Sequence, residues 1–88
     1  MKRHVKNFLA SRGVSGFEPL LCEWCWRAPL VDIHHVARRG MGGSKKLDGA
    51  ENLIGLCRPC HAEADANRIP EDALRERVGL ILNERSGR

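Results

Sequence analysis

Two Cys-x-x-Cys pairs constrain the fold of this chain more than any other feature of its sequence. Cys22 pairs with Cys25 and Cys57 with Cys60, and residues 26–56 lie between the two pairs. A Cys-x-x-Cys turn directs both thiolates toward one point, and two such turns complete the tetrahedron that zinc prefers. The intervening segment has room for a β-hairpin. The spacing therefore predicts a structural zinc site with sulfur ligands only and no open coordination position.

The size of the chain explains why it would need a metal. With 88 residues, two Trp, two Phe and no Tyr, it is expected to form one domain, residues 1–88, with a thin aliphatic core. Zinc contributes on the order of 10–16 kcal/mol to the folding of small zinc domains. Disulfides or free core thiols are the alternatives. No apolar leader or membrane-spanning stretch is evident, so we expect a cytoplasmic protein without membrane contact, whose thiols stay reduced.

Hydrophobic periodicity divides the chain into a core, residues 20–68, and two flanking segments. A basic segment, residues 1–17, precedes the core and a helix, residues 70–85, follows it. We also expect a short helix over 3–11, strands over 30–36 and 52–56, and a helix over 58–67. The last helix carries apolar residues at helical spacing, namely Leu74, Val78, Ile81 and Leu82. They would pack on the core or on a second copy of the chain, which makes a homodimer through residues 71–84 a hypothesis.

The basic residues are concentrated in two stretches, and the formal net charge is +4. The N-terminal stretch carries Lys2, Arg3, Lys6 and Arg12. The glycine-rich segment 37–51 is expected to be a long loop, and its basic residues are Arg38, Arg39, Lys45 and Lys46. This distribution favours a polyanionic partner such as DNA, which the four basic residues of the loop would contact. Contacts to phosphates position a strand but read no bases, so we expect weak sequence specificity.

A second set of ligand-type side chains lies outside the cysteine pairs. His34 and His35 end the first predicted strand, while His61 and Asp65 are four residues apart and share one face of the predicted helix. Two imidazoles and a carboxylate can hold one divalent ion and leave positions for water and phosphate. Asp32, on the same strand face as His34, is the alternative third ligand. Nitrogen and oxygen ligands suit transition metals and also accept magnesium.

The order of these motifs resembles the HNH endonuclease family. The resemblance runs from Cys22 to about Asp65, through Cys-Glu-Trp-Cys, Asp-Ile-His-His-Val, Arg-Gly-Met-Gly-Gly-Ser and Glu-Asn-Leu-Ile-Gly-Leu-Cys-Arg-Pro-Cys-His. It implies an α+β fold, namely a zinc-stapled, treble-clef-like ββα-metal domain, here with flanking N- and C-terminal helices. It also implies hydrolysis of DNA phosphodiesters with one Mg²⁺ or Mn²⁺, or else Ni²⁺ or Zn²⁺, leaving 5′-phosphate and 3′-hydroxyl ends.

The resemblance further implies a role for each matching residue. His35 holds the general-base position, and His34 and His61 hold metal-ligand positions. Asn52 holds the position whose side chain pins the loop and orients the base. Asp65 stands where some family members have a further histidine. Neighbouring residues of a straight strand point to opposite faces. The strand is therefore expected to bend or end at His35, so that His35 points at the water while His34 points at the metal and both address one phosphate.

Two other functions account for part of this pattern. A non-catalytic zinc module that binds DNA or protein explains the cysteines and the basic loop, but not the combination of His34, His35, Asn52 and His61. A nuclease subunit that is active only with partner proteins, in a phage DNA-packaging machine or a restriction system, fits the small size. Trp24 and Trp26 either pack around the zinc knuckle or stack on bases.

Overall fold

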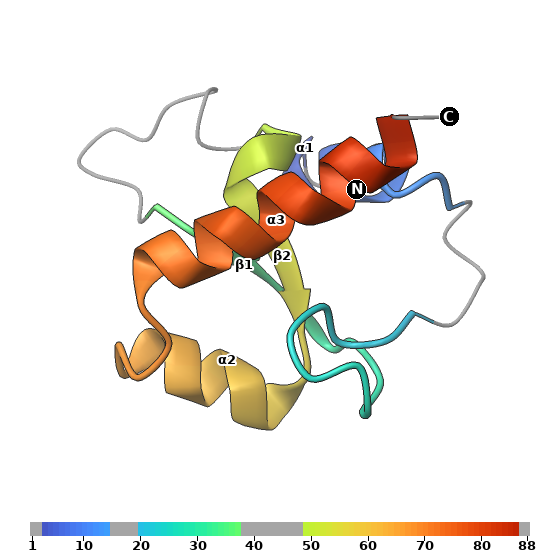
Figure 1. Ribbon diagram of the computed structural model, residues 1–88. Coiled ribbons are helices and arrows are strands. Elements are labelled where there is room, and N and C mark those ends of the chain that lie inside the picture. The colour runs from blue at the N-terminus through green and yellow to red at the C-terminus, as the bar shows by residue number, and fades with distance from the viewer. Residues whose placement is uncertain (1–2, 15–19, 38–48, 87–88) are drawn as a thin grey trace.

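Three α-helices surround a two-stranded sheet in the computed structural model, which describes residues 3–14, 20–37 and 49–86 (Figure 1). The elements are α1 (Arg3–Ser11), β1 (Asp32–His35), the 3-10 turn η2 (Ala50–Asn52), β2 (Leu53–Leu56), α2 (Arg58–Asp65) and α3 (Glu71–Ser86). The fold is therefore α+β, with a helix near each end of the chain. The helix predicted over 3–11 has the predicted bounds, and both strands are shorter than predicted. None of the described helices combines the length and apolar character that crossing a membrane requires.

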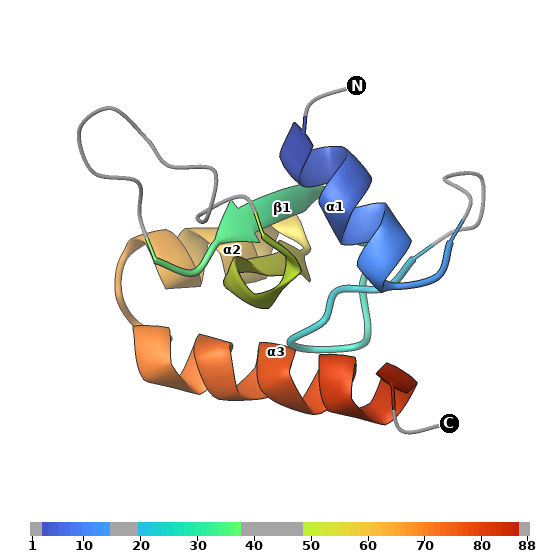
Figure 2. The same cartoon turned by 90° about the horizontal axis from the view of Figure 1, so that it is seen from above.

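The sheet has two faces that are covered by different helices. β1 and β2 pair antiparallel, with Ile33 opposite Gly55 and His34 opposite Ile54. Directly opposed residues share a face. One face therefore carries Asp32, His34, Ile54 and Leu56, and the other carries Ile33, His35, Leu53 and Gly55. Contacts to His61 place α2 over the first face, and α1 lies over the second (Figure 2).

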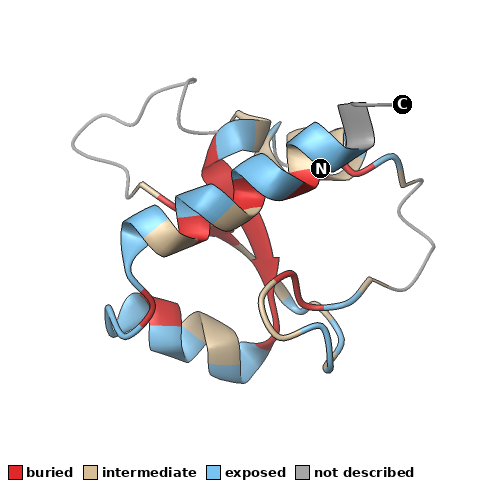
Figure 3. Ribbon diagram, in the orientation of Figure 1, coloured by how far each residue is buried: buried red, intermediate tan, exposed pale blue. Residues whose placement is uncertain are grey.

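The hydrophobic core lies mainly on the face of the sheet that α2 and α3 cover. β2 is buried along its whole length (Figure 3). Ile54 contributes to one buried cluster with Ala64 of α2 and with Leu74 and Val78 of α3. The apolar side of the last helix thus packs on the domain's own core, and Leu80 is the exposed large apolar residue of α3 in the described part of the chain.

The opposite face of the sheet has a glycine where Phe8 of α1 and Leu30 come very close to it. A Cβ atom at Gly55 would lie 2.0 Å from Leu30 Cδ1 and 2.8 Å from Phe8 Cζ. Phe8 of α1 is fully buried at this point. Glycine at this strand position therefore lets the first helix pack directly on the backbone of β2.

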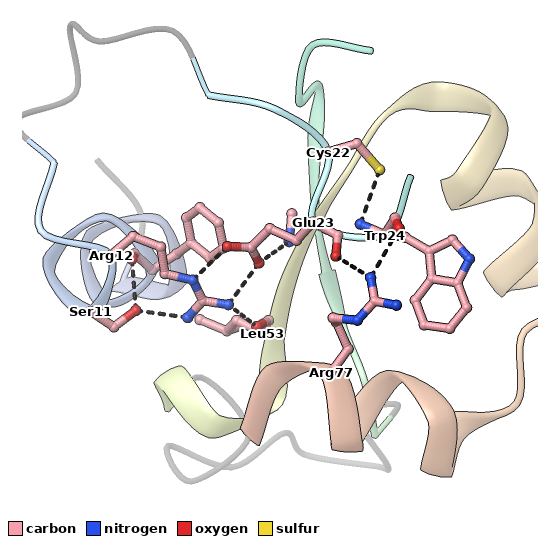
Figure 4. A network of polar contacts seen from close by, with 9 residues as sticks. Ser11, Arg12, Cys22, Glu23, Trp24, Leu53 and Arg77 are labelled. Carbon is pink, nitrogen blue, oxygen red and sulfur yellow. Dashed lines mark hydrogen bonds and ion pairs between the residues drawn. The ribbon is translucent and has the colours of Figure 1, made fainter. Parts of the chain in front are cut away.

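A buried ion pair links α1, the first cysteine turn and β2 (Figure 4). Arg12 donates from Nε and Nη2 to the two carboxylate oxygens of Glu23, at 2.9 and 2.8 Å, and from Nη2 to Leu53 O at 2.8 Å. Glu23 Oε1 also accepts from the backbone N–H of Gly55 at 3.0 Å. Only 1% of Arg12 is exposed. Arg12, which was counted in the basic N-terminal stretch, therefore adds no charge to the surface, because it is ion-paired inside the fold.

Candidate metal centres

The four cysteines converge as the spacing predicted. Their sulfur atoms all lie within 4.8 Å of one another, and all four thiols are free. Tetrahedral zinc with Zn–S bonds of about 2.3 Å needs sulfur atoms about 3.8 Å apart. The distance from Cys25 Sγ to Cys57 Sγ is 3.8 Å. The cluster therefore fits a tetrahedral structural metal such as zinc, with Cys22, Cys25, Cys57 and Cys60 as ligands.

The backbone around these cysteines stabilises negative charge on sulfur. The N–H groups of Trp24 and Cys25 point at Cys22 Sγ, with donor–acceptor distances of 3.4 and 3.5 Å. Backbone hydrogen bonds from Arg27 and Ala28 lower the pKa of Cys25 to about 6. Burial raises the pKa of Cys60 far above its ordinary value, and the three neighbouring sulfurs add to the effect. The surroundings therefore favour a thiolate at Cys25 and disfavour one at Cys60. A divalent cation bound by all four sulfurs would stabilise all the thiolates at once.

A second cluster of ligand atoms joins β1 to α2. His34, His61 and Asp65 each offer one ligand atom, and the three atoms lie within 4.8 Å of one another. Asp65 Oδ1 is 3.7 Å from His34 Nδ1, and Asp65 Oδ2 is 3.6 Å from His61 Nε2. Ligands of one ion with bonds of about 2.0–2.2 Å lie about 3.0–3.5 Å apart. Small side-chain movements would therefore bring all three onto a common cation.

Asp32 lies behind this cluster rather than in it. Its Oδ2 is 3.1 Å from His61 Nδ1, on the opposite side of the ring from Asp65. An ionised carboxylate can only accept, so the proton of this hydrogen bond belongs to His61 Nδ1. The other ring nitrogen, Nε2, faces Asp65 and is the atom that could bind an ion. Of the two carboxylates considered as third ligand, the structure groups Asp65 with the histidines and places Asp32 against Nδ1 of His61.

The side chain of Asn52 forms hydrogen bonds with the backbone that follows the histidine pair. The amide is buried, with Oδ1 accepting from Ala37 N at 2.7 Å and Nδ2 donating to Ala37 O at 3.2 Å. The backbone carbonyl of Asn52 accepts from Val36 N at 2.8 Å. These contacts hold the chain in place just after β1, where the long glycine-rich segment begins. The conformation of His34 and His35 is thereby restrained from the C-terminal side.

His35 lies on the other face of β1 from His34. β1 ends at His35, and its ring centroid is 5.0 Å from that of His4 on α1. The ring of His34 instead lies 5.2 Å from that of His61. The strand thus ends where expected, and the two adjacent imidazoles still point to opposite faces. His4 was not singled out in the sequence, since nothing there indicates that the first helix crosses the end of β1.

The four basic residues expected to contact DNA fall in the glycine-rich segment. They are Arg38, Arg39, Lys45 and Lys46, and all of them lie outside the residues that the structure describes. The contact of these four residues with phosphates therefore stays a prediction from the sequence.

The two tryptophans differ in their surroundings. The guanidinium of Arg77 stacks on Trp24, 4.4 Å from the ring centroid, and donates to the carbonyls of Glu23 and Trp24. Trp24 therefore packs beside the cysteine turn, whereas Trp26 is 51% exposed. No sequence pattern indicated these contacts of Arg77 and Glu23, because their partners lie far away along the chain.

The chain matches no protein-family model, no curated protein and no solved structure. The interpretation of the two ligand clusters therefore rests on the geometry of their side chains.

Proposed function

We propose that this protein is a metal-dependent endonuclease that hydrolyses DNA phosphodiester bonds, in the manner of the HNH family that its motifs resemble. The observation that carries the proposal is the cluster of His34, His61 and Asp65, which is separate from the four cysteines. A closed four-sulfur site has no position for a substrate. A site with two imidazoles and one half-exposed carboxylate leaves positions open.

Each residue of the second cluster then has a definite task. His34, His61 and Asp65 would hold the ion, and Asp32 keeps His61 in the tautomer that can ligate. An ion held by these residues would supply positive charge that stabilises the negative charge developing during phosphodiester hydrolysis. His35 accepts the proton of the attacking water, which suits an imidazole near neutral pH.

The position of His35 suits a substrate that lies along the outer edge of β1. In the described part of the chain, β1 pairs only with β2, so its other edge faces away from the sheet. A phosphodiester along that edge is approached by His34 from one face and by His35 from the other. The two hydrogen bonds between the Asn52 side chain and the Ala37 backbone hold His34 and His35 in position beside this edge.

The non-catalytic alternatives make a different use of the same fold. A zinc module that only binds DNA or protein needs the cysteine cluster but not a second ion beside a strand edge. A nuclease subunit of a larger assembly would keep both clusters and cleave only with its partners. Binding of a second ion therefore separates the first alternative from the proposal, and cleavage by the isolated chain separates the other.

Nicking of supercoiled plasmid by the zinc-loaded protein tests the proposal. Cleavage should require added Mg²⁺ or Mn²⁺, and His35→Ala should lower the rate by about 10²–10⁴-fold while zinc content and melting temperature stay unchanged. His4→Ala is the matched control, because it removes the other ring of the same 5.0 Å contact and leaves the base in place. It should lower the rate by much less.

Two results would count against the proposal. Wild-type protein that nicks no DNA with any of Mg²⁺, Mn²⁺, Ni²⁺ or Zn²⁺ is not a free-standing endonuclease. Cleavage by His35→Ala at the wild-type rate removes His35 from the chemistry. Omission of the added ion is the appropriate metal control, because a chelator would also strip the structural zinc and unfold the domain.

A further inference from the structure

The first cysteine turn holds an exposed tryptophan in a strained backbone conformation. Trp26 has a φ of 58° and is 51% exposed. Glycine adopts this left-handed region freely, whereas a bulky residue adopts it only at a cost in free energy. Trp24 already packs beside the cysteines, with the guanidinium of Arg77 on its ring. Because strained residues concentrate at functional sites, the exposed ring of Trp26 is a candidate binding residue.

Two exposed arginines lie at the same end of the molecule as Trp26. Arg27 is the next residue, and Arg58 follows Cys57, whose sulfur is 3.8 Å from Cys25 Sγ. Neither arginine forms an ion pair within the part of the chain that the structure describes. The cysteine cluster thus presents an aromatic ring together with positive charge.

The charge of the cysteine turn decides between a nucleic acid and a protein as the partner. Leu21 and Val31 are also about half exposed, and apolar surface alone would suit a protein. The one acidic residue of segment 20–31 is Glu23, which is buried in its ion pair, so the exposed charge of this segment is positive. Single-stranded nucleic acids bind where cationic side chains meet phosphates and aromatic rings stack on bases. The combination therefore favours a nucleic acid.

Helix α2 connects this surface with the proposed ion site. Arg58 and His61 are three residues apart, so they share a face of the helix and lie about 4.5 Å apart along its axis. Asp65 follows one further turn along the same face. A strand with one phosphate at the ion site can therefore place a neighbouring phosphate at Arg58 and a base at Trp26.

We propose that Trp26 stacks on an unpaired nucleobase of the substrate, while Arg27 and Arg58 contact the adjoining phosphates. An indole ring reaches the face of a base only where that base has left its own stack. The substrate class is therefore single-stranded or branched DNA, or the transiently unpaired regions of a supercoiled plasmid. That the bound strand is also cut rests on the proposed function. Stacking tolerates any base, which agrees with the expected weak sequence specificity.

Oligonucleotide binding without an added divalent ion tests this contact separately from cleavage. Zinc-loaded protein is titrated with a labelled oligothymidylate, with an abasic strand of the same length, and with the oligothymidylate paired to its complement. Anisotropy of the label measures each affinity. The oligothymidylate should bind about 5–150-fold more tightly than the abasic strand, which corresponds to the usual contribution of one stacked base. It should also quench tryptophan emission, because a base then lies against the indole.

Variants at Trp26 separate stacking from charge and from folding. Trp26→Leu keeps an apolar side chain and should lose both the quenching and the preference over the abasic strand, with an unchanged affinity for the duplex. Trp26→Phe keeps a ring and should retain most of the preference. Trp26→Gly removes the ring and suits the positive φ, so it should bind as weakly as Trp26→Leu while its melting temperature stays equal or rises. Leu80→Ala removes another exposed apolar side chain, on α3, and should bind as the wild type does.

Three results would overturn the assignment. They are equal binding of the oligothymidylate and the abasic strand, wild-type binding by Trp26→Leu or Trp26→Gly, and an equal loss of affinity for single strand and duplex. Failure of every oligonucleotide to bind at low salt would overturn it as well and leave a protein as the partner of this surface. Stacking by a protein that cuts no DNA would refute the proposed function alone. Plasmid cleavage without stacking at Trp26 would refute this inference alone.

Discussion

Replacing Asp32 by alanine should weaken ion binding at the proposed second metal site, although Asp32 is not among its proposed ligands. Asp32 Oδ2 is 3.1 Å from His61 Nδ1, and the two side chains are 38% and 28% exposed. In the wild type this contact favours the tautomer with the proton on Nδ1, and Nε2 lies 3.6 Å from Asp65. In Asp32→Ala the ring is free to rotate and to exchange tautomers, so part of the population cannot ligate.

The size of the effect follows from the role of such outer carboxylates. Their removal typically lowers metal affinity by about 10–100-fold, which corresponds to about 1.4–2.7 kcal/mol. Asp32→Asn keeps an oxygen that can accept from Nδ1–H and should lose less than about tenfold. His61→Ala removes a ligand and should lose far more than either variant.

Calorimetric titration of Mn²⁺ into the zinc-loaded protein measures these losses directly. Glu63→Gln is the matched control, because Glu63 is a carboxylate of α2 that pairs with Arg68 at 3.1 Å. It should bind Mn²⁺ as the wild type does. Wild-type affinity in Asp32→Ala would refute the orienting role. A loss as large as that in His61→Ala would equally refute it, since Asp32 would then be a ligand itself.

Two further predictions concern the scaffold and are checked by urea denaturation of zinc-loaded protein. Arg12→Met leaves the buried Glu23 carboxylate without its cation and should cost about 3–5 kcal/mol, whereas Arg75→Met breaks an exposed pair and should cost at most about 1 kcal/mol. Equal losses would contradict the burial of Arg12. Gly55→Ala places a methyl group 2.0 Å from a neighbouring side chain and should cost about 1–3 kcal/mol, while Gly79→Ala meets nothing within 4 Å and should be neutral or stabilising. A neutral Gly55→Ala would mean that Leu30 and Phe8 do not pack against Gly55 as described.

Local chemistry made much of the fold predictable. The cysteine cluster followed from spacing, because a Cys-x-x-Cys turn can aim its sulfurs in few directions. The pairing of His61 with Asp65 followed from helical periodicity. In both cases the backbone geometry of one element was enough. Strand alternation holds up to His35, so the expected turn of His34 and His35 toward one phosphate is not seen and the two rings lie on opposite faces.

The features that escaped prediction depend on how elements pack. Charge counting assigns Arg12 to a basic surface, because the sequence does not reveal that Glu23 and Leu53 enclose it. Alternation places Asp32 on the face of His34, but only the position of α2 decides which nitrogen of His61 it meets. The contact between His4 and His35 likewise requires knowing where α1 crosses the sheet.

The central claim is that the chain holds two metals at two independent sites. Metal analysis combined with Mn²⁺ titration of wild type, His61→Ala and Cys60→Ser tests it most directly. We predict one tightly held zinc per chain in wild type and in His61→Ala, with a second ion bound by the wild type alone. Cys60→Ser should lose both its zinc and its folded structure. Mn²⁺ binding that persists unchanged in His61→Ala, or zinc that is lost together with it, would contradict the account.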